Sequence, residues 1–170
     1  MLLALYLQPR PRRALPEQLR RSRAPHEGRM PLRSFRVAAY NAEDLFDTVH
    51  DKGKNDWEFL PLGTPNRAAH HRLDWNQHRL ALKHEQIADL VSYQGGPPDI
   101  LALIEAENER AVAPLAKRLG HDFVITDSPD SRGLDQALLY KPSPWLELVK
   151  TAEHVVEGHG ILGPTRNILE

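Results

Sequence analysis

Two carboxylates directly follow a continuous apolar segment near the middle of the chain. The segment runs from Ile100 to Ile104, and Glu105 and Glu107 come after it. Five consecutive apolar residues are typical of a strand that is buried on both faces. Residues i and i+2 of a strand point to the same side, so the sequence predicts that the two acids face one point. Ligands of open α/β sheets bind at the carboxyl ends of such strands.

A structural role for the same acids is the alternative. Asn108 is a favourable N-cap for a helix that begins at Glu109. Acids beside a helix start are stabilised by the positive end of the helix dipole, or they are simply solvated in the turn. The spacing alone leaves both interpretations open.

An earlier strand ends in polar groups of the same kind. Residues 35–40 have β-forming residues at both ends, and Asn41, Glu43 and Asp44 follow them. Residues 48–77 then show no clear period and contain several glycines and prolines, which predicts a long loop. Loops of this length are uncommon in compact domains and are often functional.

Histidines are concentrated between residues 70 and 84, a pattern that invites a metal-site hypothesis. However, His70 and His71 are adjacent, and no spacing matches a zinc motif. His84 falls on the apolar stripe of a predicted helix over 78–93, so we expect a hydrogen-bonded histidine at the core. His78 falls on the opposite, solvated face.

The rest of the pattern predicts a mixture of helices and strands. A second helix at 109–119 contains Pro114, which must kink the helix or delay its start, and Gly120 ends it. Further strands are predicted at 121–126, at 136–141 and 145–150 as a hairpin, and from 165 onward.

Composition indicates one ordinary globular domain. The chain has 170 residues, of which 41% are hydrophobic and 26% are charged. The net charge of −1 gives no general attraction to nucleic acid or to anionic membranes. Without cysteine there are no disulfides, and a metal would need oxygen or imidazole ligands. Because no segment is typical of a membrane span or a signal peptide, we expect a cytoplasmic protein.

Residues 1–33 differ from the remainder of the chain. Eight arginines against two glutamates give this segment a charge balance of +6, and its five prolines oppose regular structure. We interpret it as a basic, disordered Pro/Arg-rich arm outside the domain. We favour upstream sequence translated by mistake, because Met30 stands just ahead of the first strand. A functional arm that contacts phosphate and an unusual targeting segment are the alternatives.

Four segments carry a family resemblance when they are taken together. In chain order they are residues 40–47 (YNAEDLFD), 98–108 (PDILALIEAEN), 130–140 (DSRGLDQALLY) and 165–170 (TRNILE). Each segment is weak alone, but the order and spacing resemble those of the endonuclease/exonuclease/phosphatase superfamily of metal-dependent phosphodiesterases. The resemblance extends over about residues 35–170.

The resemblance implies a four-layer α/β sandwich in which residues 34–170 form the N-terminal half. It implies that Asn41 and Glu105 are catalytic residues that bind Mg²⁺ or Mn²⁺, with Glu43 as an outer-shell acid. Hard divalent cations prefer carboxylate and amide oxygens, and Mg²⁺ usually keeps several waters. Such an ion would neutralise the phosphate and stabilise the developing charge as water attacks. Ile104 stands where the family commonly has Gln, which removes a polar group but no ligand.

The third segment contains two candidate substrate-binding residues, Arg132 and Asp135. The alternative is that these two residues pair with each other at the edge of a loop, which would add little stability. The implied substrate is a phosphodiester or phosphate ester. The superfamily acts on DNA, RNA, phosphoinositides and small phosphate esters, so the sequence leaves the substrate and the oligomeric state open.

Later motifs of the family, an Asp-x-Asn motif and a terminal Asp-His pair among them, do not occur after Asp135 in these 170 residues. In the family they orient or deprotonate the water and bind the scissile phosphate, and a lost general base lowers the rate about 10²–10⁴-fold. Two hypotheses therefore stand. One is a metal-dependent phosphodiesterase or nuclease represented by its N-terminal half, and the other is a non-catalytic remnant or interaction fragment.

Overall fold

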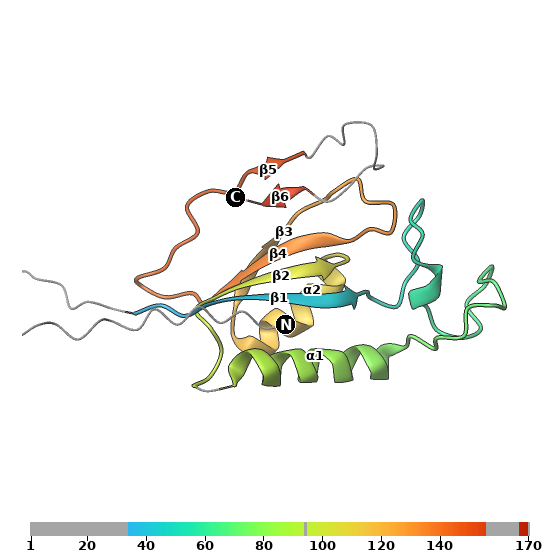
Figure 1. Cartoon of the computed structure of the whole chain (residues 1–170), viewed down its shortest axis with the longest axis horizontal. Coiled ribbons are helices and arrows are strands. Elements are labelled where there is room, and N and C mark those ends of the chain that lie inside the picture. Colours follow the sequence, from blue (N-terminus) through green and yellow to red (C-terminus); the bar gives the residue numbers. More distant parts are fainter. Residues whose placement is uncertain (1–33, 94, 156–166, 170) are drawn as a thin grey trace, which may run out of the picture.

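The computed structural model describes residues 34–93, 95–155 and 167–169, which form a mixed α/β structure (Figure 1). The α/β prediction is therefore confirmed. The elements in chain order are β1 (Val37–Leu45), the short 3-10 helix η2 (Trp57–Phe59), α1 (Gln77–Ser92), β2 (Ile100–Ala106), α2 (Glu109–Leu119), β3 (Asp122–Ile125), β4 (Asp135–Tyr140), β5 (Glu153–His154) and β6 (Ile168–Leu169).

Four strands form the main sheet in the order β1-β2-β4-β3. β1 and β2 are parallel, and α1 lies between them in the chain, as the crossover between parallel strands requires. β4 is antiparallel to both β2 and β3. The apolar run at the start of β2 thus forms a central strand, as its composition predicts.

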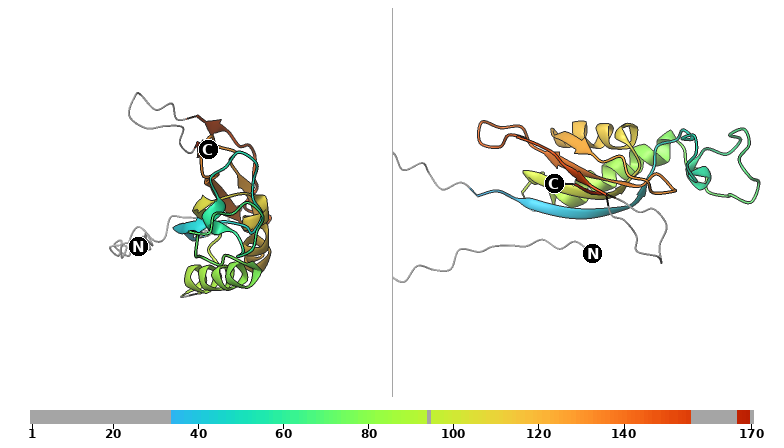
Figure 2. Two further views of the ribbon diagram at one scale, coloured as in Figure 1. Left: turned by 90° about the vertical axis from the view of Figure 1, so that its right-hand side faces the viewer. Right: turned by 90° about the horizontal axis from the view of Figure 1, so that it is seen from above.

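Both helices pack on one face of this sheet, as the two further views show (Figure 2). Alternate residues of the strands point into this layer together with the apolar stripes of the helices. The buried core consists of Ala42, Leu45, Phe46, Trp75, Leu80, Ile87, Ala88, Val91, Leu101, Leu103, Ala106, Ala111, Val112, Leu115, Ala116, Leu119, Leu134, Ala137 and Leu139. On the opposite face Val37, Ala39 and Asn41 of β1 are exposed.

The helix ends follow the capping residues in the sequence. Asn76 accepts hydrogen bonds from two backbone N–H groups at the start of α1, and Asn108 accepts one from Ala111 at the start of α2. Gly120 ends α2 in the left-handed conformation with φ of 71°. Pro114 lies inside α2 without delaying its start.

One predicted strand is wrong. Residues 145–150 form no strand, and only an isolated bridge joins Ser143 to Leu146. A hairpin with β4 is impossible because β2 and β3 already occupy both edges of that strand. The chain instead forms β5 further on, which pairs with β6 in a separate two-stranded sheet.

The predicted arm over 1–33 lies outside the described residues, as do residues 165, 166 and 170 of the last predicted strand. Within the described part of the chain, no helix is long and apolar enough to cross a membrane.

Candidate active site

The parallel pairing of β1 and β2 places the first two nominated residues on neighbouring strands, although Asn41 lies within β1 and not after its end, as the predicted strand over 35–40 implied. Asn41 is in register with Ile104, so Glu105 is the next residue along the neighbouring strand. The pairing resumes between Leu45 and Ala106, which leaves one residue of β2 opposite three residues of β1. An irregularity of this kind re-aims side chains and is common next to active sites.

The backbone at this irregularity is strained. Glu43, Asp44 and Glu105 have φ of 50°, 67° and 64°, in the left-handed region that non-glycine residues rarely adopt. Each such residue costs of order 1–3 kcal/mol, so the surroundings must hold it in place. Asn41 helps to do so, because its Oδ1 accepts a 2.8 Å hydrogen bond from the N–H of Glu43.

Lys83 of α1 contacts the left-handed turn formed by Glu43 and Asp44 from the helical layer. Its Nζ donates to the carbonyl oxygens of Glu43 at 2.6 Å and of Asp44 at 3.1 Å. It also lies 5.3 Å from the centre of the Trp75 ring. Burial lowers the pKa of Lys83, while the charges of Asp44, Glu43 and Glu105 act against this shift.

Arg132 and Asp135 do not pair with each other, contrary to that interpretation of the sequence. Arg132 instead forms an ion pair with Asp44, with 3.1 Å between Nη1 and Oδ1. This contact joins the loop before β4 to the end of β1. Arg132 therefore lies beside the turn of Glu43 and Asp44 in β1, and its contact with a substrate stays a prediction.

Asp135 is buried at the start of β4 and holds the preceding loop. Its Oδ1 accepts hydrogen bonds from the Thr126 hydroxyl at 2.7 Å and from the Ser128 N–H and hydroxyl at 2.8 and 2.6 Å. Burial raises the pKa of Asp135, and these three donors oppose the shift. Contact of this carboxylate with a substrate stays a prediction.

Glu105 and Glu107 do not face one point, contrary to the prediction made from their two-residue spacing in a strand. The irregularity at Glu105 breaks the alternation of the strand. Glu107 is buried, and its Oε2 accepts a 2.8 Å hydrogen bond from the N–H of Asp47. Burial, together with the charges of Asp47, Asp51 and Asp56, raises the pKa of Glu107 to about 8.

The aspartates around Glu107 have partners of their own. Arg110 of α2 forms ion pairs with Asp47 and Asp51. Asp56 accepts from the N–H of Asp51 at 2.7 Å, and its other oxygen lies 2.5 Å from Nδ1 of His50. We call Asp47, Asp51, Asp56 and Glu107 the acidic loop cluster. Its contacts attach the first part of the loop after β1 to Glu107 and to Arg110 of α2.

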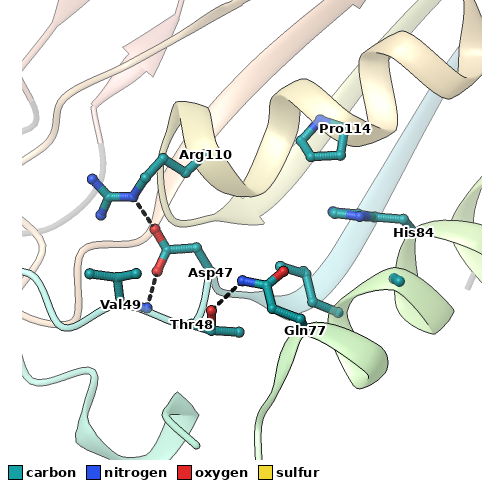
Figure 3. A pocket seen from close by; sticks show the side chains of 9 residues that line it. Asp47, Thr48, Val49, Gln77, His84, Arg110 and Pro114 are labelled. Carbon is teal, nitrogen blue, oxygen red and sulfur yellow. Dashed lines mark hydrogen bonds and ion pairs between the residues drawn. The ribbon is translucent and has the colours of Figure 1, made fainter.

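A pocket of about 200 Å³ lies next to this cluster (Figure 3). It is lined by Asp47, Thr48, Val49, Gln77, Leu80, Ala81, His84, Arg110 and Pro114. Figure 3 shows Arg110 joined to Asp47 and Gln77 joined to Thr48 across its wall. We call the group formed by Asn41, Glu43, Asp44, Glu105 and Arg132 the strand-end site. Neither Asn41 nor Glu105 lines the pocket, so the pocket is separate from this site.

His84 and His78 lie as their positions predict. Nε2 of His84 donates to the carbonyl oxygen of Ala111 at 2.8 Å, and this side chain is buried between α1 and α2. His78 is exposed. Among the described residues, no group of three or more His, Asp or Glu side chains could hold a metal ion.

The strand-end residues nevertheless suit a divalent ion that keeps most of its water. Asn41 offers an amide oxygen and Glu105 a carboxylate from adjacent strands, and both are of the oxygen type that Mg²⁺ prefers. Magnesium is commonly held by one or two carboxylates with waters in the remaining positions. The donor set therefore fits such an ion without a cage of three protein carboxylates.

Lys83 is the residue at this site that the sequence analysis missed. It lies three residues after Leu80 and four before Ile87, both of which are buried in the core. A lysine with this spacing faces the packed side of a helix, and that was the signal available in the sequence. Asp47 and Arg110 could not be found in this way, because their contact joins positions 63 residues apart.

The sequence of residues 36–169 matches the endonuclease/exonuclease/phosphatase family. This match covers most of the chain, and the chain belongs to that family of hydrolases. No curated protein and no solved structure matches it significantly. Members of the superfamily generally depend on a divalent metal.

Proposed function

We propose that this protein is a metal-dependent hydrolase of phosphodiester or phosphate ester bonds, with its metal site at the ends of β1 and β2. The observation that carries the proposal is the strand register. Asn41 of β1 pairs with Ile104 of β2, and Glu105 is the next residue of β2. The left-handed backbone of Glu105 supports it, since strain of this kind is concentrated at functional sites.

In this proposal Asn41 and Glu105 bind Mg²⁺ or Mn²⁺ through their side-chain oxygens, and Glu43 acts from the outer shell. When bound, the ion supplies positive charge to a phosphate oxygen and to the developing negative charge. Arg132 adds a guanidinium at the same end of the sheet, a group suited to phosphate. Asp135 contributes by fixing the loop that carries Arg132, through its bonds to Thr126 and Ser128.

The architecture we propose is the four-layer sandwich of this family, with residues 34–170 as its N-terminal half. The exposed side chains on the face of β1 opposite the helices support a second layer there. The two-stranded β5–β6 pair would belong to that second sheet. Residues 1–33 are proposed to lie outside this domain.

The decisive experiment is a Mn²⁺ titration of the complete chain, followed by electron paramagnetic resonance. We expect Glu105→Ala and Asn41→Ala to weaken Mn²⁺ binding at least tenfold, because each removes a protein ligand. Glu147→Ala is the matched control, since Glu147 is an exposed acid in the segment between β4 and β5. Equal Mn²⁺ affinity in Glu105→Ala and the unmodified protein would refute the site.

Catalysis is tested separately with bis(4-nitrophenyl) phosphate, a generic phosphodiester. A hydrolase releases 4-nitrophenolate in Mn²⁺, and Glu105→Ala abolishes this release. A non-catalytic binding protein of the same family would bind Mn²⁺ through the same residues and leave the diester intact.

A further inference from the structure

A lysine ammonium is built into the acidic strand-end site. Nζ of Lys83 lies 2.6 Å from the carbonyl oxygen of Glu43 and 3.1 Å from that of Asp44. The side chain is partly buried, so its charge acts in a medium that screens less than water. Lys83 thus brings a positive charge from α1 to the left-handed turn of β1.

The third acid of this site is brought next to the turn by the strand register. Glu105 is the single residue between Ile104 and Ala106, whose partners in β1 are Asn41 and Leu45. Glu105 therefore lies opposite the stretch of β1 that Lys83 contacts. The charges of Asp44, Glu43 and Glu105 all act on the Lys83 ammonium in the direction that keeps it protonated.

Two cations, Lys83 and Arg132, lie beside the acids of the strand-end site. Glu43, Asp44 and Glu105 carry three negative charges, Lys83 carries one positive charge, and Arg132 carries a second through its ion pair with Asp44. Lys83 donates its hydrogen bonds to backbone carbonyls rather than to a carboxylate of the turn. Its ammonium therefore acts on the three carboxylates through its charge and lowers their joint negative potential.

We propose that Lys83 is the resident cation of the strand-end site, and that its ammonium and a divalent ion compete as counter-ions of Glu43, Asp44 and Glu105. The part of this inference that concerns the divalent ion rests on the proposed function. Two like charges near the same acids repel each other, so each lowers the affinity of the site for the other. Lys83 accordingly stabilises the strained turn before a metal binds and weakens metal binding.

The metal-independent half of the inference is tested by a double-mutant cycle in EDTA. Lys83→Met keeps most of the length of the unbranched side chain and removes its charge, and Glu105→Gln removes the partner charge. We expect Lys83→Met to lower the urea midpoint of the complete chain, and to lower it clearly less in the Glu105→Gln background. Lys83→Arg keeps the charge and is expected to retain most of the coupling to Glu105. Additive effects of Lys83→Met and Glu105→Gln would overturn the proposal.

The competition is tested by Mn²⁺ titration of the same variants. We expect Lys83→Met to bind Mn²⁺ about three- to tenfold more tightly than the unmodified protein, from the removal of one like charge near the site. Lys83→Arg is expected to bind Mn²⁺ as the unmodified protein does. Equal or weaker binding by Lys83→Met, with Glu105→Gln still abolishing it, would overturn the competition and leave the proposed metal site intact.

A different result identifies failure of the proposed function instead. If Glu105→Gln leaves Mn²⁺ binding unchanged, the metal site at the strand ends is wrong. The cycle in EDTA still decides in that case whether Lys83 is the counter-ion of Glu105, because no metal takes part in it.

Discussion

The backbone N–H of Asp47 donates a 2.8 Å hydrogen bond to Oε2 of Glu107, which is buried beyond the end of β2. The N–H of Glu107 in turn donates to the carbonyl oxygen of Leu45 at 2.9 Å. These two contacts attach the loop after β1 to the segment between β2 and α2. Glu107 is therefore an internal acid of the fold, whereas Glu105 belongs to the strand-end site.

The first prediction concerns Glu107. With a pKa raised to about 8, its side chain is mainly neutral at pH 7. The variant Glu107→Gln has a neutral side chain whose oxygen can still accept the hydrogen bond from the N–H of Asp47. We therefore expect little change in the free energy of unfolding at pH 7. Glu107→Ala leaves that buried N–H unpaired and is expected to cost about 1–3 kcal/mol. Urea unfolding at pH 7 measures both, and an equal loss in the two variants would contradict this role.

The second prediction is a pH dependence caused by His84. Burial lowers the pKa of His84 below its ordinary value of 6.5, although its bond to Ala111 opposes the shift. The unfolded chain then binds a proton more readily than the folded one, so stability falls as the pH drops below 6.5. The slope from this one group is at most about 1.4 kcal/mol per pH unit.

Urea unfolding between pH 7.5 and 5.5 measures this slope. We expect His84→Gln to reduce it and His78→Gln to leave it unchanged, because His78 is exposed on the same helix. An unchanged slope in His84→Gln would show that other groups cause the pH dependence.

The third prediction separates Asp135 from Arg132. Asp135→Ala leaves the buried donors of Thr126 and Ser128 without their acceptor, and we expect a loss of more than about 2 kcal/mol in unfolding free energy. Asp135→Asn keeps an oxygen for these donors and should lose clearly less. Arg132→Ala removes a half-exposed ion pair and should cost less than about 1 kcal/mol. Chemical denaturation ranks the three, and the reverse order would refute this division of roles.

The fourth prediction concerns the dual contacts of Asn108. Its Oδ1 caps α2 at Ala111, and its Nδ2 donates to Asp47 and Asp51 at 3.1 Å each. Asn108→Ser keeps a capping oxygen and loses the amide donor, whereas Asn108→Ala loses both. We expect Asn108→Ala to cost at least about 1 kcal/mol and Asn108→Ser an intermediate amount. Equal thermal stability of Ser and Ala variants would exclude a contribution from the cap.

Several parts of the fold follow from local patterns and were correctly predicted. The stripe containing Leu80, Ile87 and Val91 forms the buried face of α1, and His84 lies on it. Gly120 ends α2 because it adopts the left-handed conformation without a side-chain clash. Such features depend on residues within a few positions of each other, so the sequence contains the information directly.

The predicted strand at 145–150 failed for a reason that no local pattern contains. Val149 and its neighbours have β-forming character, but a strand requires a free edge to pair with. β4 lies between β2 and β3, which are placed there by pairings of distant residues. Edge availability is a property of the whole sheet.

By itself, the sequence determined the family and the central position of the apolar strand, and it selected Asn41 and Glu105, whose role as metal ligands stays a prediction. These conclusions rest on residue type, periodicity and the order of motifs along the chain. Only the tertiary structure decided that Glu105 and Glu107 have separate environments, because one left-handed residue breaks the two-residue alternation of a strand. Only the tertiary structure placed the charge of Lys83 at the same site, since the contact between α1 and β1 joins residues about 40 positions apart.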